Sequence, residues 1–376
     1  MKYKNQRIRA VSIIVFLILI SSLLTGCWSA RELNESALVA GVGFDKDGDQ
    51  YKMTVQILQP LKLTPNARTK SSNATYITSE TGQSIFGIIR TFPHKTARKL
   101  FWSHAHVFVI GRDLAQQSVT ETLDWFYRNQ ELRPLSYVVL SATSAADVLE
   151  SKTELNPIGA YGVANIVSVL TDTSDAPRVD LMDFMALSAS PVHAAYMPEL
   201  NQLEVIGTGV FLHDRLVGEL SLAESKGLTS LIGKVGGGHM TIPSLTNPSQ
   251  HMAVEIIHGG AKRSVQLIHG EPAVLYQLNY VVDIAEDPNL FPHDTQTFNE
   301  IEHRVEMLVQ QDAMQCIAKV KSYHADVIGT GEAIELRYPQ IWKRLEKNWT
   351  DEFPRVPISV DVTVHLRHEG IIQGSI

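Results

Sequence analysis

The amino-acid sequence predicts a multi-domain α+β protein, in which mixed sheets pack against helices and the second half is rich in antiparallel strands. Three observations lead to this prediction. In the first half, runs with the two-residue alternation of strands follow runs with helical spacing. Residues 205–285 contain several strand-like runs, and a long amphipathic helix and a last strand follow them. The 376 residues are 44% hydrophobic and 19% charged, as in a folded chain with a sizeable core.

The N-terminus begins with a basic segment that leads into an apolar run. Residues 1–10 include Lys2, Lys4, Arg7 and Arg9 and no acidic residue, and residues 11–24 are apolar except for serines. As a helix, residues 11–24 would extend about 21 Å, short of the roughly 30 Å hydrocarbon core of a bilayer. This length after a positive start is typical of a secretory signal peptide. The alternative is an uncleaved anchor helix over residues 8–24.

The residues that follow resemble the lipobox of bacterial lipoproteins. Leu24-Thr25-Gly26-Cys27 has an apolar residue, two small residues and a cysteine. The resemblance implies cleavage between Gly26 and Cys27, an S-diacylglycerol group on the Cys27 sulfur and an acyl group, such as palmitate, on its nitrogen. Two or more acyl chains anchor a protein stably, whereas one chain binds a membrane reversibly. We therefore expect membrane attachment through lipid on Cys27.

Charge and cysteine content restrict the partners. Residues 1–26 hold four basic and no acidic residues, so the remaining chain has 29 Lys+Arg, 40 Asp+Glu and a net charge of −11. This balance argues against nucleic-acid binding and against adhesion to anionic lipid by charge alone. The only cysteines are Cys27 and Cys316. With lipid on the first, the second has no disulfide partner and is expected in the core.

The first half is predicted to alternate between strands and helices. Asp47-Gly48 favours a hairpin turn. Residues 171–198 contain three prolines and are expected to form a connection with one helix near 181–187. The other predicted elements are strands at 39–44 and 51–57, a loop at 61–74, a helix at 84–91, a strand at 101–110, a helix at 114–129, a strand at 135–141 and a helix at 145–151.

The second half is predicted to be mainly antiparallel strands with one long helix. Gly259-Gly260 is expected to form a turn between two strands. Thr297 and Glu300 fit a capping box at the start of a helix that continues to Val320. The predicted strands are 205–212, 215–220, 253–257, 264–268, 273–284 and 358–366, with a loop at 236–238 and a short helix around 342–349.

Two groups of side chains resemble metal ligands but fall short of a metal site. His104 and His106 would share one face of a predicted strand, but no third ligand is near them, so structural histidines are favoured. Asp45, Asp47 and Asp49 have the alternate spacing of a calcium loop. Positions six and twelve of that loop would be glutamines, where glycine and glutamate are needed. We expect no metal at either place.

The sequence contains no catalytic signature. The Gly-x-Gly pairs at 41–43 and 207–209 lack the third glycine of a dinucleotide site and are expected to be strand glycines. Trp342 and Trp349 are expected to pack in the core or at an interface. We therefore expect a protein that is not an enzyme, with no catalytic residues and no cofactor.

Several separated segments of the sequence form one pattern that runs from the lipobox to the last strand. The segments are Gly26-Cys27-Trp28, residues 31–33, 39–45, 102–104 and 110–115, Arg128 with 131–133, residues 207–211 and 215–218, Glu224, Gly227, residues 326–331, Pro339, Trp342, Trp349 and Phe353-Pro354. Their order and spacing are more specific than any single motif. Together they resemble the C-subunit lipoproteins of spore germinant receptors, the Ger(x)C or GerAC-like family.

The resemblance implies a three-domain α+β fold and a role in the germination of a Bacillales-type spore. It implies a non-catalytic C subunit on the outer face of the spore inner membrane, assembled with two membrane subunits, A and B, into a nutrient receptor. Only Cys27 is carried over as a functional residue. We expect a signal peptide at 1–26, an N-terminal region at 27–200 and a C-terminal region at 201–376. The alternative function is a solute-binding lipoprotein that captures the germinant itself.

Overall fold

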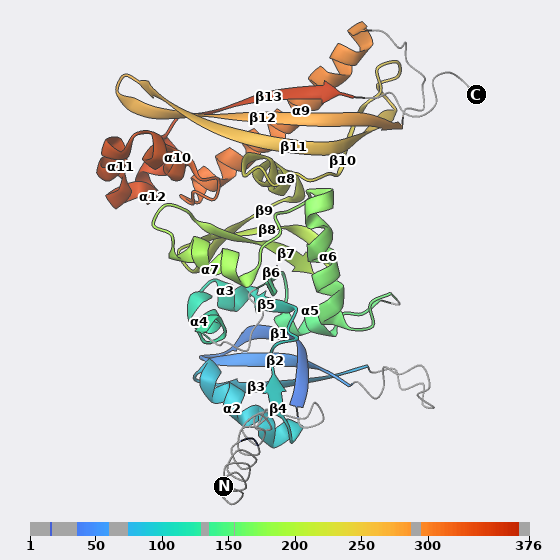
Figure 1. Ribbon diagram of the computed structural model, residues 1–376, viewed down its shortest axis with the longest axis vertical. Coiled ribbons are helices and arrows are strands. Elements are labelled where there is room, and N and C mark those ends of the chain that lie inside the picture. The colour runs from blue at the N-terminus through green and yellow to red at the C-terminus, as the bar shows by residue number, and fades with distance from the viewer. Residues whose placement is uncertain are drawn as a thin grey trace, which may run out of the picture.

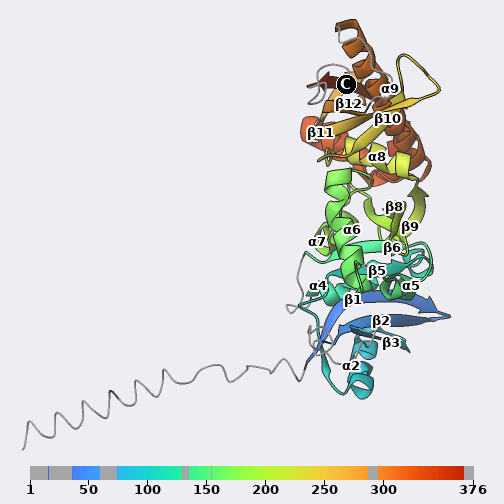
Figure 2. The ribbon, with the colours of Figure 1, turned by 90° about the vertical axis from the view of Figure 1, so that its right-hand side faces the viewer.

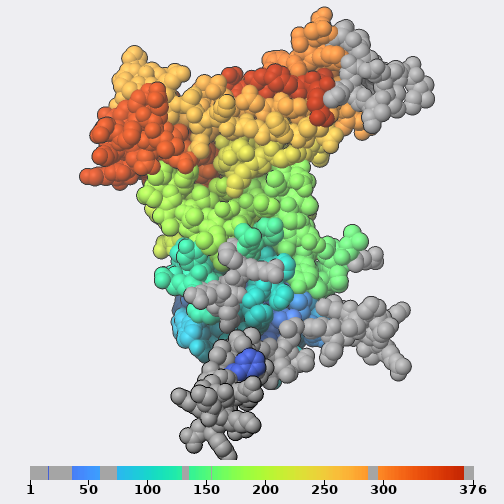
Figure 3. Space-filling view, in the orientation of Figure 1, coloured from blue at the N-terminus to red at the C-terminus, as the bar shows by residue number. Residues whose placement is uncertain are grey.

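The protein is an elongated stack built on two sheets (Figures 1 and 2). The computed structural model describes residues 36–59, 74–128, 135–153, 155–286 and 295–367, and the isolated residue Phe16. A nine-stranded sheet occupies one end and the middle, and a four-stranded sheet occupies the other end. The four-stranded end is wider than the middle in the space-filling view (Figure 3). The α+β class with mixed sheets is therefore confirmed.

The first sheet combines an antiparallel meander with parallel strands. Its order is β3-β2-β1-β5-β6-β7-β8-β9, and β4 pairs with the start of β1. The strands β1, β5, β6 and β7 run parallel to their neighbours in this group, whereas β2, β3, β8 and β9 are antiparallel. The bounds are β1 (Ser36–Asp47), β2 (Gln50–Leu58), β3 (Thr75–Gly82), β4 (Lys99–Phe101), β5 (Val107–Gly111), β6 (Tyr137–Ser141), β7 (Ala195–Asn201), β8 (Glu204–Leu212) and β9 (Arg215–Leu220).

Helices cover both faces of this sheet. On one face, α2, α4 and α7 join a core that includes Phe44, Phe108 and Phe126, whose rings contact one another. On the other face, α5 and α6 pack on Ala40 and Val139 in a second core cluster. The helices are α2 (Ile85–Thr96), α3 (Arg112–Ala115), α4 (Thr120–Arg128), α5 (Ala145–Glu150), α6 (Gly159–Thr173) and α7 (Leu181–Ala189).

The second sheet has the order β10-β11-β12-β13, with β13 parallel to β12. Helices α8 and α9 pack against it and against each other, where an added Cβ on Gly227 would lie 2.2 Å from the carbonyl oxygen of Asp312. The elements are α8 (Leu222–Leu231), β10 (His239–Pro243), β11 (His251–Ile268), β12 (Glu271–Glu286), α9 (Thr295–Ser322), α10 (Thr330–Arg337), α11 (Pro339–Leu345), α12 (Trp349–Glu352) and β13 (Ile358–Leu366).

Three predicted elements of the first half differ from the structure. The strand expected at 101–110 is two strands, because β4 pairs with the start of β1 and β5 with its later part, with a turn between them. The helix expected at 114–129 is also divided into α3 and α4. At the break, the Val119 N–H donates to the carbonyl of Asp214 (2.9 Å) in the β8–β9 turn. The connection expected at 171–198 contains the end of α6 and most of the buried strand β7.

Two expectations for the second half are also wrong. Gly259-Gly260 makes no turn, since both residues lie inside the continuous strand β11. An added Cβ on Gly259 would lie 2.9 Å from the Val235 side chain, so this glycine allows close packing. The described part of α9 already begins at Thr295, which places Thr297 inside the helix and not at its N-cap. Helices α6 and α8 were not expected at all.

Candidate functional site

The predicted lipidation residue, Cys27, and its neighbour Gly26 lie outside the residues that the structure describes. The first described strand, β1, begins at Ser36 and pairs in register with Lys99 of β4. In the described ranges, no helix combines the length and the apolar character that crossing a bilayer needs. Lipid on Cys27 therefore stays a prediction from the sequence.

A cluster of charged side chains lies at the carboxyl ends of the parallel strands. Asp45, near the end of β1, accepts a hydrogen bond from the backbone N–H of Ala145 (2.8 Å) at the start of α5. Arg112, which follows β5, donates to Glu199 of β7 (Nη2 to Oε1, 2.6 Å) and also forms an ion pair with Glu219 of β9. Arg112 thus links the end of β5 to β7 and β9, and Asp45 links β1 to α5.

Burial affects the two least exposed carboxyl groups of this cluster. Desolvation raises the pKa of Asp45, and hydrogen bonds from the N–H groups of Ala145 and Ala146 oppose the rise. Desolvation and then the nearby Glu219 charge raise the pKa of Glu199, and the Arg112 guanidinium opposes them. Arg112 forms ion pairs with both Glu199 and Glu219, so its loss would leave two like charges close together.

A hollow of about 300 Å³ lies beside this cluster. The chain leaves β5 into α3 on one face of the sheet and leaves β6 toward α5 on the other face. Crevices of small-molecule sites form at such points in open α/β sheets. The lining is charged with both signs and consists of Asp45, Lys46, Lys52, Arg112, Asp113, Ala142, Thr143 and Ser144.

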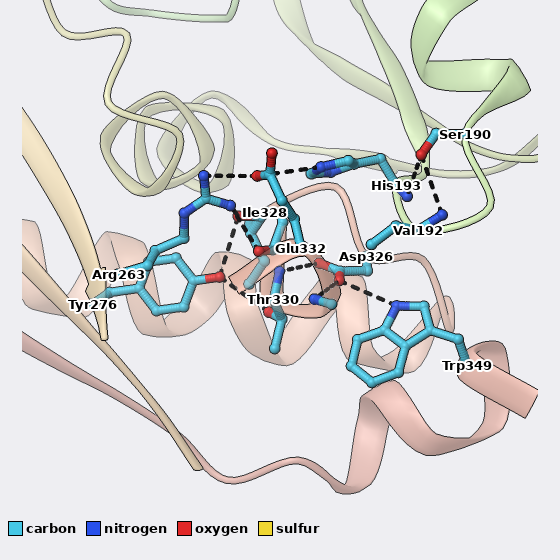
Figure 4. Close-up of polar contacts among 12 residues, drawn as sticks. Ser190, Val192, His193, Arg263, Tyr276, Asp326, Ile328, Thr330, Glu332 and Trp349 are labelled. Atoms are coloured by element: carbon cyan, nitrogen blue, oxygen red, sulfur yellow. Dashed lines mark hydrogen bonds and ion pairs between the residues drawn. The ribbon is translucent and has the colours of Figure 1, made fainter. Parts of the chain in front are cut away.

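A second polar cluster surrounds Asp326, just before α10 (Figure 4). The Asp326 carboxylate is buried and accepts three hydrogen bonds. These come from the N–H of Thr330 (3.0 Å), the N–H of Gly331 (2.7 Å) and the indole Nε1 of Trp349 (3.2 Å). Desolvation raises the pKa of Asp326, and these donors oppose the rise. Asp326 thus holds the start of α10 against α12.

The same cluster joins the two sheets. The Asp326 carbonyl accepts from the N–H of Ala194 (3.0 Å), just before β7 of the first sheet. Arg263 of β11 donates to the carbonyl of Gly329 (2.7 Å) and pairs with Glu332 (2.9 Å). Glu332 also faces His193 Nε2 at 3.4 Å (Figure 4). The loop before β7 is thereby fixed to the C-terminal helices.

The structure places the other predicted residues as follows. Cys316 is a buried free cysteine, as predicted, and burial raises its pKa. Trp342 and Trp349 are buried with ring centroids 5.0 Å apart, which confirms core packing. His104 and His106 lie in the turn before β5, so the expected shared strand face is wrong.

The glycines of the two Gly-x-Gly pairs lie where the backbone packs closely against its neighbours. An added Cβ on Gly41 would lie 2.6 Å from Ala160, and one on Gly207 would lie 2.0 Å from the carbonyl oxygen of Leu220, which confirms closely packed strand glycines. Among the described residues, no group of three His, Cys, Asp or Glu side chains is placed to hold a metal ion.

Sequence reasoning did not identify the roles of the two polar clusters. Asp45, Arg112 and Asp326 belong to the segments that resemble the family, but nothing local shows their partners. Glu199 and Arg263 were missed entirely. One available signal was Glu199 itself, a carboxylate within the otherwise uncharged run 194–200, because a buried charge requires a partner.

Two models of known protein families match nearly all of the described residues. A family model described as "Spore germination protein N-terminal domain" matches residues 29–202, and one described as "Spore germination B3/ GerAC like, C-terminal" matches residues 206–370. The division between them, residues 203–205, falls at the turn after β7 and the first residues of β8, inside the first sheet.

Relatives and a solved structure agree with these matches. Spore germination protein YndF of Bacillus subtilis (strain 168) is 27% identical over 99% of this chain and 100% of its own length. Spore germination protein KC of the same organism is 22% identical over 97% of each chain. The crystal structure of the GerBC protein covers 87% of this chain and 96% of its own, with a TM-score of 0.59 and 20% identity, and shows the same fold. The chain therefore belongs to the GerAC-like family of spore germination proteins.

Proposed function

We propose that this protein is the lipid-anchored, non-catalytic C subunit of a nutrient germinant receptor and is needed for spore germination. The observation that carries the proposal is the match of two germination family models, which together extend from residue 29 to residue 370 with only residues 203–205 between them. A subunit role fits relatives that share this architecture over nearly their full length.

In this proposal, the signal peptide is removed before Cys27, and its lipid holds the chain on the outer face of the spore inner membrane. The apolar run at 11–24 followed by Leu24-Thr25-Gly26-Cys27 supports this step. The partners are the A and B membrane subunits of the receptor. The extended stack of two sheets offers these subunits a long surface. We also propose that the mature chain consists of an N-terminal region at 27–200 and a C-terminal region at 201–376.

The polar clusters support a structural role. The Asp326 carboxylate accepts hydrogen bonds from two backbone N–H groups and an indole. The Arg112 guanidinium forms ion pairs with two glutamates. Groups that are fully engaged within the protein hold elements in place, whereas reacting groups need an open position for substrate. The link between the two sheets is a separate contact, in which the Asp326 carbonyl accepts from the Ala194 N–H (3.0 Å).

The test is deletion of the gene followed by complementation in spores. We expect the deletion strain to lose the response to its nutrient and to keep nutrient-independent germination. Wild-type protein and the control Cys316→Ala should restore the response, whereas Cys27→Ala should restore it poorly. A tagged wild-type protein should retain the A and B subunits during purification. A normal nutrient response in the deletion strain would contradict the proposal.

Direct capture of the germinant is the second candidate function. The hollow of about 300 Å³ beside Arg112 favours it, because its lining contains two lysines, an arginine and two aspartates. Such a lining suits a zwitterion like an amino acid. Isothermal titration of the protein with candidate amino acids and sugars is the test, with Lys52→Met expected to weaken any binding. Absence of heat with every nutrient that germinates the spores would contradict capture.

A further inference from the structure

The segment that forms α2 and β4 has no acidic residue, although the chain as a whole is acidic. Residues 81–112 contain no Asp or Glu, while the full chain has 40 of them. Helix α2 and strand β4 lie in this stretch, and Arg90, Arg98 and Lys99 are exposed there. Lys95 forms an ion pair with Glu80 (2.7 Å), which precedes the stretch. Three exposed cations, Arg90, Arg98 and Lys99, therefore lie on α2 or close after it, with no acidic residue between them in the sequence.

The outer face of α2 combines this charge with an exposed aromatic ring. Phe86 is 50% exposed, and the guanidinium carbon of Arg90 lies 5.0 Å from the centre of its ring. The two residues are four apart and therefore share one face of the helix. Ile85, Ile88 and Phe92 are buried and point into the core. The helix is amphipathic, but its outer face is apolar and cationic together.

A hollow of about 660 Å³ opens beside this face, between α2 and α4. The acidic side chains on its α4 side are already engaged. Asp124 accepts from Arg128 Nε (2.8 Å), and Glu121 accepts from the Tyr51 hydroxyl (3.2 Å). Arg128 offsets the charge of Asp124, whereas the neutral Tyr51 hydroxyl leaves the charge of Glu121 in place. With Arg90 and Lys99 included, the lining of the hollow still holds more cations than anions. The α2 side of the hollow includes Phe86 and Arg90.

The position of Cys27 in the sequence brings this end toward the membrane. Ser36 begins β1 and pairs with Lys99 of β4. Cys27 precedes Ser36 by nine residues, so the two Cα atoms are at most about 32 Å apart in a fully extended chain. The four-stranded sheet lies at the opposite end of the molecule (Figure 1). A lipid on Cys27 would thus keep α2 and β4 nearer the bilayer than the rest of the fold.

We propose that the α2 surface, defined as Phe86, Arg90, Arg98 and Lys99, rests on the anionic phospholipid headgroups of the membrane that holds Cys27. The inference deepens the proposed function and rests on it. Each cation near an anionic surface strengthens binding about fivefold, and the effect fades beyond roughly 10 Å at ordinary salt. The Phe86 ring enters the headgroup boundary, as aromatic side chains of interfacial helices do. The lipid anchor supplies attachment, and the α2 surface fixes the orientation.

The test separates this surface from the anchor. The chain from residue 27 onward with Cys27→Ala, which cannot carry lipid, is mixed with vesicles at low salt and sedimented. Vesicles of phosphatidylcholine alone are compared with an equimolar mixture of phosphatidylcholine and phosphatidylglycerol. We expect binding to the anionic vesicles only, and loss of that binding as salt is added. Adding Arg90→Gln and Arg98→Gln together should lower the vesicle partition coefficient about 25-fold.

A matched control carries the same loss of charge at the other end of the molecule. Arg337→Gln with Arg344→Gln on α10 and α11 should bind as the parent does. Phe86→Ser should weaken binding with no change of charge. Equal binding by parent and Arg90→Gln/Arg98→Gln, or no binding to anionic vesicles, would overturn the proposal. If those two substitutions instead release the A or B subunit during purification, the α2 surface is a protein contact and the proposal is also overturned. The mass of the Cys27 peptide from full-length protein tests lipidation independently.

Discussion

Replacing Asp326 by alanine is expected to destabilise the folded protein by about 4 kcal/mol. The carboxylate is buried and accepts from Thr330 N–H, Gly331 N–H and Trp349 Nε1. A buried donor that loses its acceptor costs about 1–3 kcal/mol, so three donors give roughly 3–9 kcal/mol. Burial also disfavours the charged carboxyl group itself, as its raised pKa shows. Removing the carboxyl group therefore relieves this desolvation penalty and reduces the net loss of stability. We therefore expect a value in the lower half of the range.

Asp326→Asn keeps the shape and one accepting oxygen, so it should cost about 2 kcal/mol. Both variants are measured by urea unfolding, followed by tryptophan fluorescence, because Trp349 contacts Asp326 directly. The control is Asp351→Ala, whose side chain is 73% exposed and which should change stability by less than about 0.5 kcal/mol. A loss below about 1 kcal/mol for Asp326→Ala would refute the reasoning, because the three donors would then have other partners.

Three further changes test the packing and the charge clusters. Gly227→Ala should lower the free energy of unfolding in urea by about 1–3 kcal/mol, because the added Cβ would meet the Asp312 carbonyl. The control Gly260→Ala should leave the free energy of unfolding nearly unchanged, since an added Cβ there has no neighbour within 4 Å. Arg112→Met should lower the free energy of unfolding by about 2 kcal/mol at pH 7. The loss should be smaller at pH 4, where protonation of Glu199 removes its repulsion of Glu219. An equal loss at both pH values would contradict this. Burial raises the pKa of Asp312 from 3.8 to about 6, so the folded form binds more protons between these values and stability falls as the pH rises. Asp312→Asn should then raise the free energy of unfolding by about 1 kcal/mol at pH 7, a value reduced for the partial exposure of the side chain. At pH 3 the substitution should give no gain. No gain at pH 7 would contradict the raised pKa of Asp312.

Local patterns predicted the elements that each carry a complete signal. β2 and β13 alternate apolar and polar residues, and Asp47-Gly48 marks the turn into β2. The apolar spacing of α9 likewise predicted that Cys316 is buried. β13 and α9 each have one core side and one solvent side, so their sequence period reflects the environment. β2 alternates in sequence although its polar residues Thr54 and Gln56 are buried as well. The family resemblance was also correct, because many short segments agreed in order.

The remaining elements depend on contacts far along the chain. Strand β7 is buried on both faces and contains Pro198, so it shows neither alternation nor a typical strand composition. β4 and β5 are separate because they pair with different parts of β1, which no local pattern reveals. The same holds for the charge clusters: Arg112 and Glu199 are 87 residues apart in sequence. Overall net charge likewise hid the acid-free stretch at α2.

The most direct test of the central claim is the fate of Cys27 in spores. Membrane fractionation is combined with mass spectrometry of the N-terminal peptide for the wild type, Cys27→Ala and the control Cys316→Ala. We predict that wild type and Cys316→Ala are in the inner-membrane fraction and begin with a lipid-modified Cys27. We predict that Cys27→Ala is soluble or lost. A Cys27→Ala protein that stays on the membrane and supports a normal nutrient response would contradict the lipid-anchored subunit.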